Sequence, residues 1–280
     1  MRVLTFDIEE WFHCDCISGS YDWDIYDKRI DHDTDKILQL LADHNQKATF
    51  FCLGWIAEKY PFIIKKIHSQ GHQIGCHSNL HQLICRFTKE QFEADTVTAL
   101  KRIEDITGEK IILYRAPAFS ITKKFKWAFE VLVENGIEFD CSVFPAKHEY
   151  GGFPSLGIST PALLDVNGCL IKEFPVNAKK IIYKNVVFSG GGYFRILPYH
   201  IIHKWMQQSN YVMTYFHPRD FDADQPLLAQ LPLHRKFKSY VGLKSAFRKL
   251  ERLMGDFEFV NIKEADQMID WHTVKKIRVL

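Results

Sequence analysis

The 280-residue chain has little net charge, no long apolar run and no paired-cysteine motif. Its 36 Lys and Arg balance 34 Asp and Glu to a formal net charge of +2, which argues against a nucleic-acid binder driven by bulk electrostatics. No apolar stretch approaches the roughly 18 residues that a membrane-spanning helix needs. Seven cysteines are scattered without a Cys-x-x-Cys pair, so neither a structural zinc motif nor a disulfide framework is indicated. The first seven residues turn acidic before a signal-peptide core could form, and we expect a reduced, cytoplasmic protein.

Apolar and aromatic residues are plentiful. Hydrophobic residues make up 46% of the chain, and 22 Phe, 11 Tyr and 6 Trp supply enough apolar mass for a large core. This composition excludes a disordered or fibrous chain. The length would allow two domains, but an α/β barrel commonly uses about 250 residues as one unit, so we expect a single domain over residues 1–280.

Short apolar runs alternate with longer segments of helical spacing. The runs predict strands at residues 3–6, 48–53, 72–77, 111–115, 137–143, 211–217 and 257–260. Helical spacing predicts helices at residues 55–70, 89–106, 122–134, 198–209 and 240–254. This alternation predicts an α/β fold with a parallel sheet and favours closure into a barrel. Residues 146–196 are rich in Gly and Pro and are interpreted as inserted hairpins or long loops, with a tight turn at the Gly-Gly-Gly of 190–192.

Polar residues follow several of the predicted strands, at the end where the active sites of such barrels lie. They are Asp7, Glu9 and Glu10 after the first strand, His77 and His81 after the third, Arg115 after the fourth and His217 after a late one. Together they supply the groups that metal-assisted hydrolysis requires.

The spacing of His77 and His81 suits metal binding, because one helical turn would bring both imidazoles to the same side. Chance gives about 0.6 such pairs among so many histidines, and His68 and His72 form a second pair for which we claim no site. The other polar residues also have structural interpretations: acids capping a helix, an arginine paired with a surface acid, or a histidine packed in a loop. The His-Cys-Asp-Cys run at residues 13–16 is not taken as a metal site, because alternate residues of an extended chain point apart.

Five motifs resemble, in order along the chain, those of the polysaccharide deacetylases of the NodB-homology type, carbohydrate esterase family 4. Residues 71–81 (GHQIGCHSNLH) resemble the second motif, which ends in a metal-binding histidine. Residues 5–7 resemble the start of the first, 115–119 (RAPAF) the third, 140–144 (DCSVF) a divergent fourth and 215–217 (YFH) the fifth. Residues 189–199 and 217–222 look like a subgroup associated with bacterial exopolysaccharide and surface-glycan gene clusters.

The first motif departs from the family pattern. Two adjacent aspartates are usual there, the first acting as base and the second binding metal, whereas Ile8 follows Asp7 here. The resemblance gives Asp7 the base role and Glu9 the metal role, with Glu10 as the alternative ligand. The Glu9 carboxylate, two residues after Asp7, can reach the metal only if the loop after the strand turns. The fourth motif also lacks the family's usual Trp.

The resemblance implies a distorted (β/α) barrel of about seven strands that removes an N-acetyl group from an acetamido sugar. It implies a divalent metal, Zn²⁺ with Co²⁺ or Ni²⁺ as alternatives, held by Glu9, His77 and His81. His217 would act as the acid and Arg115 would hold Asp7. The residues expected near the oxyanion or the substrate are Phe119, Asp140 and Tyr193.

Three functions are weighed. The leading one is a metal-dependent N-deacetylase acting on an acetylated sugar of a surface glycan or its precursor. The others are a related amidase or O-acetyl esterase, and a non-catalytic glycan-binding relative with a degraded site. Bound metal separates the last from the others. The sequence leaves open which sugar is used, whether it is free, nucleotide-linked, lipid-linked or polymeric, and the oligomeric state.

Overall fold

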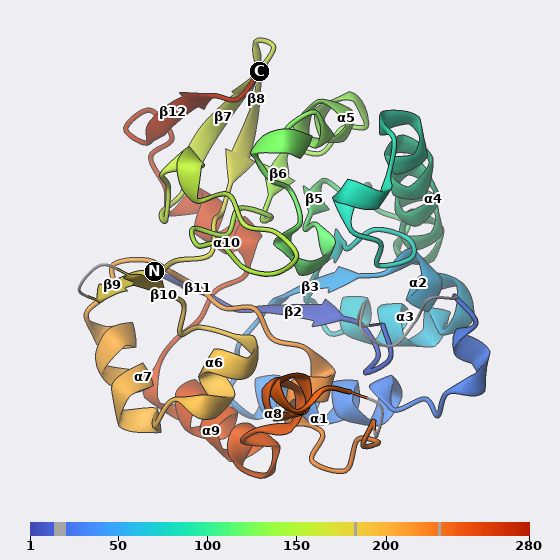
Figure 1. Cartoon of the computed structure of the whole chain (residues 1–280), viewed down its shortest axis with the longest axis vertical. Helices are drawn as coiled ribbons and strands as arrows, with labels where there is room; N and C mark the ends of the chain where they lie inside the picture. The colour runs from blue at the N-terminus through green and yellow to red at the C-terminus, as the bar shows by residue number, and fades with distance from the viewer. Residues whose placement is uncertain (14–20, 182–183, 229–230) are drawn as a thin grey trace.

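An eight-stranded sheet crosses the molecule (Figure 1). The computed structural model describes residues 1–13, 21–181, 184–228 and 231–280. The strands lie in the order β12-β7-β8-β6-β5-β4-β3-β2, and neighbouring strands are parallel except in the β7–β8 hairpin. Their bounds are β2 (Thr5–Ile8), β3 (Thr49–Cys52), β4 (Gln73–Cys76), β5 (Leu113–Tyr114), β6 (Phe139–Asp140), β7 (Ala162–Val166), β8 (Cys169–Glu173) and β12 (Lys275–Arg278). Two further pairs are β1 (Arg2–Val3) with β11 (Val212–Met213) and β9 (Lys179–Ile181) with β10 (Lys184–Val186).

Helices flank this sheet. In Figure 1, α2 to α4 lie at the right and α6 to α9 gather in the lower part of the view. The helices are α1 (Ile30–Asp43), α2 (Gly54–Lys59), α3 (Pro61–Ser69), α4 (Lys89–Thr107), α5 (Ala128–Glu134), α6 (Gly191–Ile196), α7 (Tyr199–Gln207), α8 (Leu233–Tyr240), α9 (Leu243–Asp256) and α10 (Ile262–Gln267). Strands β2 and β3 are buried at every residue, as expected for parallel strands covered on both faces. The predicted α/β fold with a mostly parallel sheet is confirmed.

One predicted helix is divided. Residues 55–70 were expected to form a single helix, but α2 ends at Lys59 and α3 begins at Pro61. Proline lacks the N–H that a continuing helix would donate, and its ring disfavours a helical conformation at the preceding residue. Tyr60 accordingly has φ −134° and ψ 56°. Proline therefore starts the second helix here, the position at which helices tolerate it.

Residues 146–196 contain the expected hairpins but do not simply lie beside the sheet. The β7–β8 hairpin joins the central sheet between β6 and β12, and β9 and β10 form a second hairpin. The helix α6 was not expected, because the glycines that open it conceal a short amphipathic segment. Helix α1 and strand β12 were also missed. Whether the chain is one domain stays a prediction.

The sheet is extended beyond β2 by a segment that includes β11. Phe6 forms a parallel bridge to Phe216, and Tyr215 forms one to Gly190. Across the remaining gap, the side chain of Asn177 accepts hydrogen bonds from the Met213 N–H at 3.2 Å and the Ser189 hydroxyl at 3.3 Å. The side chain of Asn177 thus bonds to both of these segments. Full closure of the barrel stays a prediction.

Candidate active site

Strand β2 and the turn after it bring two carboxylates to the site. Successive side chains of a strand alternate, so Thr5 and Asp7 lie on the same side of the sheet, and Glu9 directly follows the last residue of β2. The Glu9 N–H donates to the Asp7 carbonyl at 3.0 Å, which makes a tight turn centred on Ile8. The loop after Asp7 therefore turns, as Glu9 requires in order to take the place of the second aspartate of the family's first motif. Both carboxylates are buried.

The two histidines of the second motif come from the loop after β4. His77 and His81 were expected to share one helical turn, but this loop is not helical, and Ser78 and His81 have positive φ angles of 69° and 52°. The Ser78 hydroxyl accepts the His81 N–H at 3.0 Å and fixes the turn. The imidazoles converge although the local structure differs from the helix predicted.

Glu9, His77 and His81 form a buried group with metal-ligand geometry. One potential ligand atom of each residue lies within 4.8 Å of those of the other two. Among the described residues, no other set of three or more His, Cys, Asp or Glu side chains has this arrangement. The Glu9 Oε2 atom is 2.5 Å from His81 Nε2 and 3.9 Å from His77 Nε2. His77 Nδ1 lies 2.8 Å from the Arg115 carbonyl. A carbonyl only accepts, so Nδ1 carries the proton and Nε2 keeps its lone pair for a ligand.

The charge states of these residues also fit a divalent cation. Burial lowers the pKa of His77 to about 4, which keeps this imidazole neutral. Burial opposes ionisation of Glu9, but the charges of His81, His217 and Arg219 outweigh it and hold its pKa well below the usual range. Two imidazole nitrogens and a carboxylate are a donor set that suits Zn²⁺ and other first-row divalent ions.

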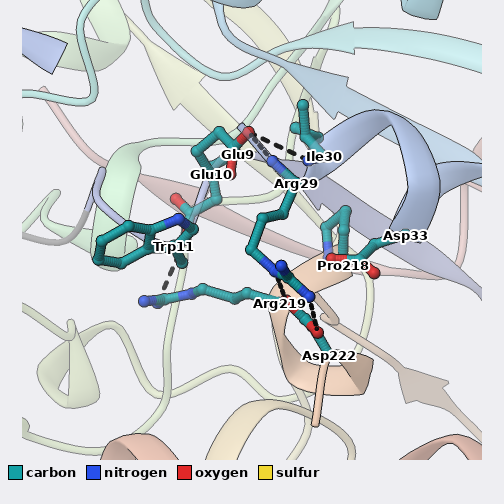
Figure 2. Close-up of a pocket in the computed structure, with 9 residues that line it drawn as sticks. All are labelled: Glu9, Glu10, Trp11, Arg29, Ile30, Asp33, Pro218, Arg219 and Asp222. Atoms are coloured by element: carbon teal, nitrogen blue, oxygen red, sulfur yellow. Dashed lines mark hydrogen bonds and ion pairs between the residues drawn. The ribbon is translucent and has the colours of Figure 1, made fainter. Parts of the chain in front are cut away.

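Glu10 points away from the histidines. Its Oε1 accepts the N–H groups of Arg29 at 2.7 Å and Ile30 at 3.0 Å, and so satisfies two free donors at the start of α1 (Figure 2). The side chain lines a small pocket together with Arg29 and Asp222, which form an ion pair. Burial raises the pKa of Glu10 to about 7. Of the two glutamates, the structure brings Glu9 and not Glu10 to the imidazoles.

Arg115 is fully buried and holds Asp7. Its Nη1 donates to Asp7 Oδ1 and to the Thr5 hydroxyl, each at 2.7 Å, and its Nε donates to the Cys141 carbonyl at 3.3 Å. The guanidinium also lies 4.2 Å from the centre of the Phe51 ring. These contacts leave Asp7 Oδ2 directed at the opposite side of the site.

His217 faces both carboxylates from the end of the segment that contains β11. Its Nε2 is 3.8 Å from Asp7 Oδ2 and 3.7 Å from Glu9 Oε1. Its Nδ1 lies 2.8 Å from Asp220 Oδ2. Burial favours the neutral imidazole, but the charges of Glu9 and Asp220 outweigh burial and raise the pKa of His217. Because its pKa is raised, the His217 ring stays protonated to a higher pH than an unperturbed imidazole does.

Asp220 and Arg195 are functional candidates that the sequence reasoning missed. Asp220 lies in the 3₁₀ turn Pro218–Phe221, and burial of its carboxylate is outweighed by the charges of His217, Arg195 and Arg219, which lower its pKa to about 2. Arg195 Nε is 3.2 Å from Asp220 Oδ1. The His-Pro-x-Asp spacing was the available signal, because an acid three residues after a histidine can cap the turn between them.

Of the residues expected near the oxyanion or the substrate, Phe119 is buried and Tyr193 is half exposed. Phe119 is buried against Phe144 and Tyr215, and it has φ 48°, as does the preceding Ala118. The Phe119 N–H donates to the Ala116 carbonyl at 3.0 Å, so Phe119 itself does not offer a free oxyanion donor. Tyr193 lies on α6 and is half exposed.

Asp140 is not at the opening of the site. It ends β6, fully buried, and its carboxylate accepts the Ser142 N–H at 2.9 Å and the Ser142 hydroxyl at 2.7 Å. Burial and the neighbouring Asp140 raise the pKa of Glu173 well above its usual value, so a protonated Glu173 shares this buried position. The placement of Asp140 does not support the predicted substrate contact, because its side chain turns into the interior of the sheet.

The run at residues 13–16 extends beyond the described residues at Cys14, Asp15 and Cys16. His13 is described, and its ring packs between Trp23 and Trp55 with centroid distances of 4.3 and 5.0 Å. Its Nδ1 accepts the Glu10 N–H at 3.1 Å. His13 is therefore part of the aromatic core beneath the site.

Two family models match the chain in succession. Residues 4–137 match polysaccharide deacetylase, and residues 141–267 match a domain of unknown function, DUF3473. The resemblance to the polysaccharide deacetylases that the motifs predict is thus confirmed over residues 4–137. This first matched region contributes Asp7, Glu9, His77, His81 and Arg115, whereas His217 and Asp220 lie in the second matched region.

Curated relatives are similar to part of the chain. A peptidoglycan-N-acetylglucosamine deacetylase of Bacillus cereus is 36% identical over 98 residues, covering 35% of this chain and 36% of the relative. A peptidoglycan-N-acetylmuramic acid deacetylase, PdaA of Bacillus subtilis, is 29% identical over 92 residues, covering 33% and 35%. The matched part of the chain thus spans about a third of the length of these relatives.

Solved structures share the fold over nearly the whole chain. A Mycobacterium smegmatis protein, assigned provisionally to the polysaccharide deacetylases, gives a TM-score of 0.66 at 17% identity, covering 98% of this chain and 91% of that one. Peptidoglycan deacetylase PdaC of Bacillus subtilis gives 0.50 at 15% identity, covering 95% and 89%. At these identities the similarity establishes the fold.

Proposed function

We propose that the chain is a metal-dependent hydrolase that removes the N-acetyl group from an acetamido sugar of a surface glycan or its precursor. The observation that carries the proposal is the convergence of Glu9, His77 and His81, with Asp7 and His217 on either side of them. A divalent metal bound there supplies Lewis acidity toward a water molecule and the acetyl carbonyl. Zn²⁺ is our first choice, with Co²⁺ or Ni²⁺ as alternatives.

Asp7 is positioned to act as the general base. Its Oδ1 accepts a hydrogen bond from Arg115, which fixes the orientation of the carboxylate. Its Oδ2 faces His217 Nε2 across 3.8 Å, and a proton removed from a nucleophilic water is accepted at this oxygen.

His217 is positioned to act as the general acid. Expulsion of an amine requires protonation of its nitrogen, and the proton is delivered from Nε2. Asp220 holds Nδ1 and stabilises the protonated ring. The two proton carriers are therefore held by separate partners, Arg115 for the base and Asp220 for the acid.

The curated relatives support the substrate class. Their names assign them to deacetylation of N-acetylglucosamine or N-acetylmuramic acid in peptidoglycan, and each is similar to about a third of this chain. We infer an acetamido sugar as substrate, and the assay below decides among its forms.

The decisive measurement is acetate release from a panel of N-acetylated oligosaccharides and peptidoglycan fragments, with O-acetylated sugars as a second arm. The metal-loaded protein is expected to release acetate from an N-acetylated substrate, whereas chelator-stripped protein is expected to be inactive and to recover on reloading. Asp7→Asn should lower turnover by roughly 10²- to 10⁴-fold while retaining metal. The exposed Asp31→Asn is the matched control and should behave as the parent. Release from O-acetylated sugars alone, or from none, would refute the proposal.

A further inference from the structure

Helix α8 lies on the surface with a combination of side chains that the proposed chemistry does not use. None of its residues is buried. Leu233 is 84% exposed and Phe237 is 60% exposed, although both are large apolar residues. An eight-residue helix in water gains little stability by itself, so its position is set by contacts at its ends.

The apolar side chains of α8 form one stripe with lysines on both sides. At about 100° per residue, Leu233 and Phe237 lie about 40° apart around the helix, with Lys236 about 60° to one side of Leu233 and Lys238 about 100° to the far side of Phe237. Phe237 and Lys238 are exposed, and Lys236 is partly exposed. An apolar stripe bordered by basic residues is the pattern of helices that lie in the plane of a membrane interface.

Neighbouring segments extend the apolar surface. The Leu228 N–H donates to the Tyr240 hydroxyl, which itself donates to the Pro226 carbonyl, and these bonds hold Leu227, 78% exposed, beside the last turn of α8. Ile196 ends α6, next to α8 in Figure 1, and is also exposed. We name Leu227, Leu233, Lys236, Phe237, Lys238 and Ile196 the α8 surface.

Positive charge is concentrated around this surface. Residues 232–250 contain six Lys or Arg and no Asp or Glu, and one of the six, Arg235, is paired with Glu149, whereas the whole chain has a net charge of +2. The rest of the chain therefore carries a net charge of −4. Such an asymmetry attracts the molecule to an anionic surface in one orientation.

The α8 surface is directly connected to the site. Arg195 donates through Nη1 to the Ser239 carbonyl at 2.7 Å and through Nη2 to the Lys238 carbonyl at 2.9 Å. The Nε of the same guanidinium is 3.2 Å from Asp220, the partner of His217. One buried arginine thus fixes α8 relative to the general acid.

We propose that the α8 surface docks on an anionic lipid bilayer, with Leu233 and Phe237 entering the interface and Lys236 and Lys238 contacting lipid headgroups. No helix in the described residues is long and apolar enough to span a membrane, so the contact is peripheral. Docking holds the site beside the headgroups, where a glycan carried by a lipid is presented. The lipid contact itself is independent of the proposed hydrolysis.

Vesicle co-sedimentation tests the proposal. The metal-loaded protein should bind vesicles of phosphatidylglycerol and phosphatidylcholine, bind pure phosphatidylcholine far less, and be released by salt. Lys236→Gln combined with Lys238→Gln should weaken binding about 30-fold, since each basic residue near such a surface contributes about fivefold. Leu233→Ser combined with Phe237→Ser should weaken it at least about tenfold.

Matched controls remove the same groups elsewhere. Lys123→Gln with Lys124→Gln removes two exposed lysines, and Phe62→Ser with Met268→Ser removes two exposed apolar side chains. Both control pairs should bind as the parent does. Acetate release from a soluble oligosaccharide should be unchanged in all four variants, so failure of docking is distinguishable from failure of the proposed function.

Three results would overturn the proposal: no binding to anionic vesicles, equal losses in the α8 and control pairs, or a stable solution dimer dissociated by the Leu233 and Phe237 substitutions. The last result would assign the surface to a second copy of the chain. Should the serine pair fail to fold, the glutamine pair, which removes no apolar contact, decides the matter.

Discussion

The Asp220 carboxylate lies 2.8 Å from Nδ1 of His217, so Asp220→Asn tests the acid role of this histidine through the pH dependence of turnover. Asparagine keeps an oxygen that can accept from the ring and removes the negative charge. The protonated imidazole is the active form of an acid, and activity is lost as pH rises through its pKa. Because Glu9 and Asp220 raise the pKa of His217 against the effect of burial, removal of the Asp220 charge should move this loss to lower pH.

The structure sets the size of the shift. An opposite charge in direct contact changes a pKa by about 1 to 3 units. Asp220 also faces Arg195 at 3.2 Å, which offsets part of its charge, and Glu9 still acts on the imidazole in the variant. We therefore expect the lower end, about one pH unit, which corresponds to about 1.4 kcal/mol.

The assay is kcat/KM for acetate release from pH 5 to 10, with parent and variant loaded with the same metal so that its charge is common to both profiles. Asp222→Asn is the matched control, because Asp222 pairs with Arg29 rather than with His217. The alkaline limb should move in Asp220→Asn and stay fixed in Asp222→Asn. An unmoved limb in a folded, metal-loaded Asp220→Asn protein would show that His217 is not the group being titrated.

Three further changes address other parts of the site. Glu9→Gln should lower metal affinity by more than about 100-fold. Glu10→Gln should retain metal and lower the melting temperature, because it weakens the cap of α1. Metal analysis and thermal melting separate the two variants, and the reverse pattern would exchange the roles of the two glutamates. Arg115→Lys keeps a positive charge but cannot bind Asp7, Thr5 and a carbonyl together, so kcat should fall at least about tenfold with metal content unchanged; parent-like kcat would contradict this. Gly190→Ala would place a Cβ 2.0 Å from the Tyr215 carbonyl oxygen and should destabilise folding by about 3 kcal/mol or more. The Cβ of Gly192→Ala would lie 3.6 Å from the Lys238 carbonyl oxygen, so this change should be close to neutral in denaturant unfolding.

Most of the correct predictions of strands, helices and site residues came from the spacing of apolar residues and from the polar residues at strand ends. The strand at residues 48–53 and the helix at 89–106 nearly coincide with β3 and α4, because each has a strong apolar pattern and α4 begins and ends with clear capping residues, Thr88 and Gly108. Long periodic segments leave few alternative ways to bury their apolar faces. The clustering of polar residues at the strand ends follows from the parallel sheet that these elements form.

The wrong predictions concern helices and loops whose local structure is not visible in the spacing of apolar residues. Helix α6 opens with glycines, which do not predict a helix. Helix α1 begins with a turn rich in aspartate, and the helical apolar spacing of Ile37, Leu38 and Leu41 appears only in its second half. The His77–His81 loop owes its shape to positive φ angles and to the Ser78 hydroxyl rather than to a helical turn. Such backbone conformations depend on tertiary contacts, which a spacing rule does not contain.

The acid partner of His217 shows the same limit. A histidine followed by an acid three residues later is common, and the pair becomes informative only when burial and the approach of Arg195 are known. Arg195 is 25 residues earlier in the chain, and no sequence period relates the two. Their contact depends on how α6 packs against the turn at Pro218–Phe221.

The position of β12 at the edge of the sheet affects the behaviour of the protein in solution. Within the described residues no strand pairs with the outer side of β12, whose backbone is therefore a template for strand addition by another chain. Lys275, Lys276 and Arg278 are exposed along this short strand. Their repulsion hinders edge-to-edge aggregation, and charge-neutralising changes at these positions would favour precipitation at concentrations at which the parent remains dispersed.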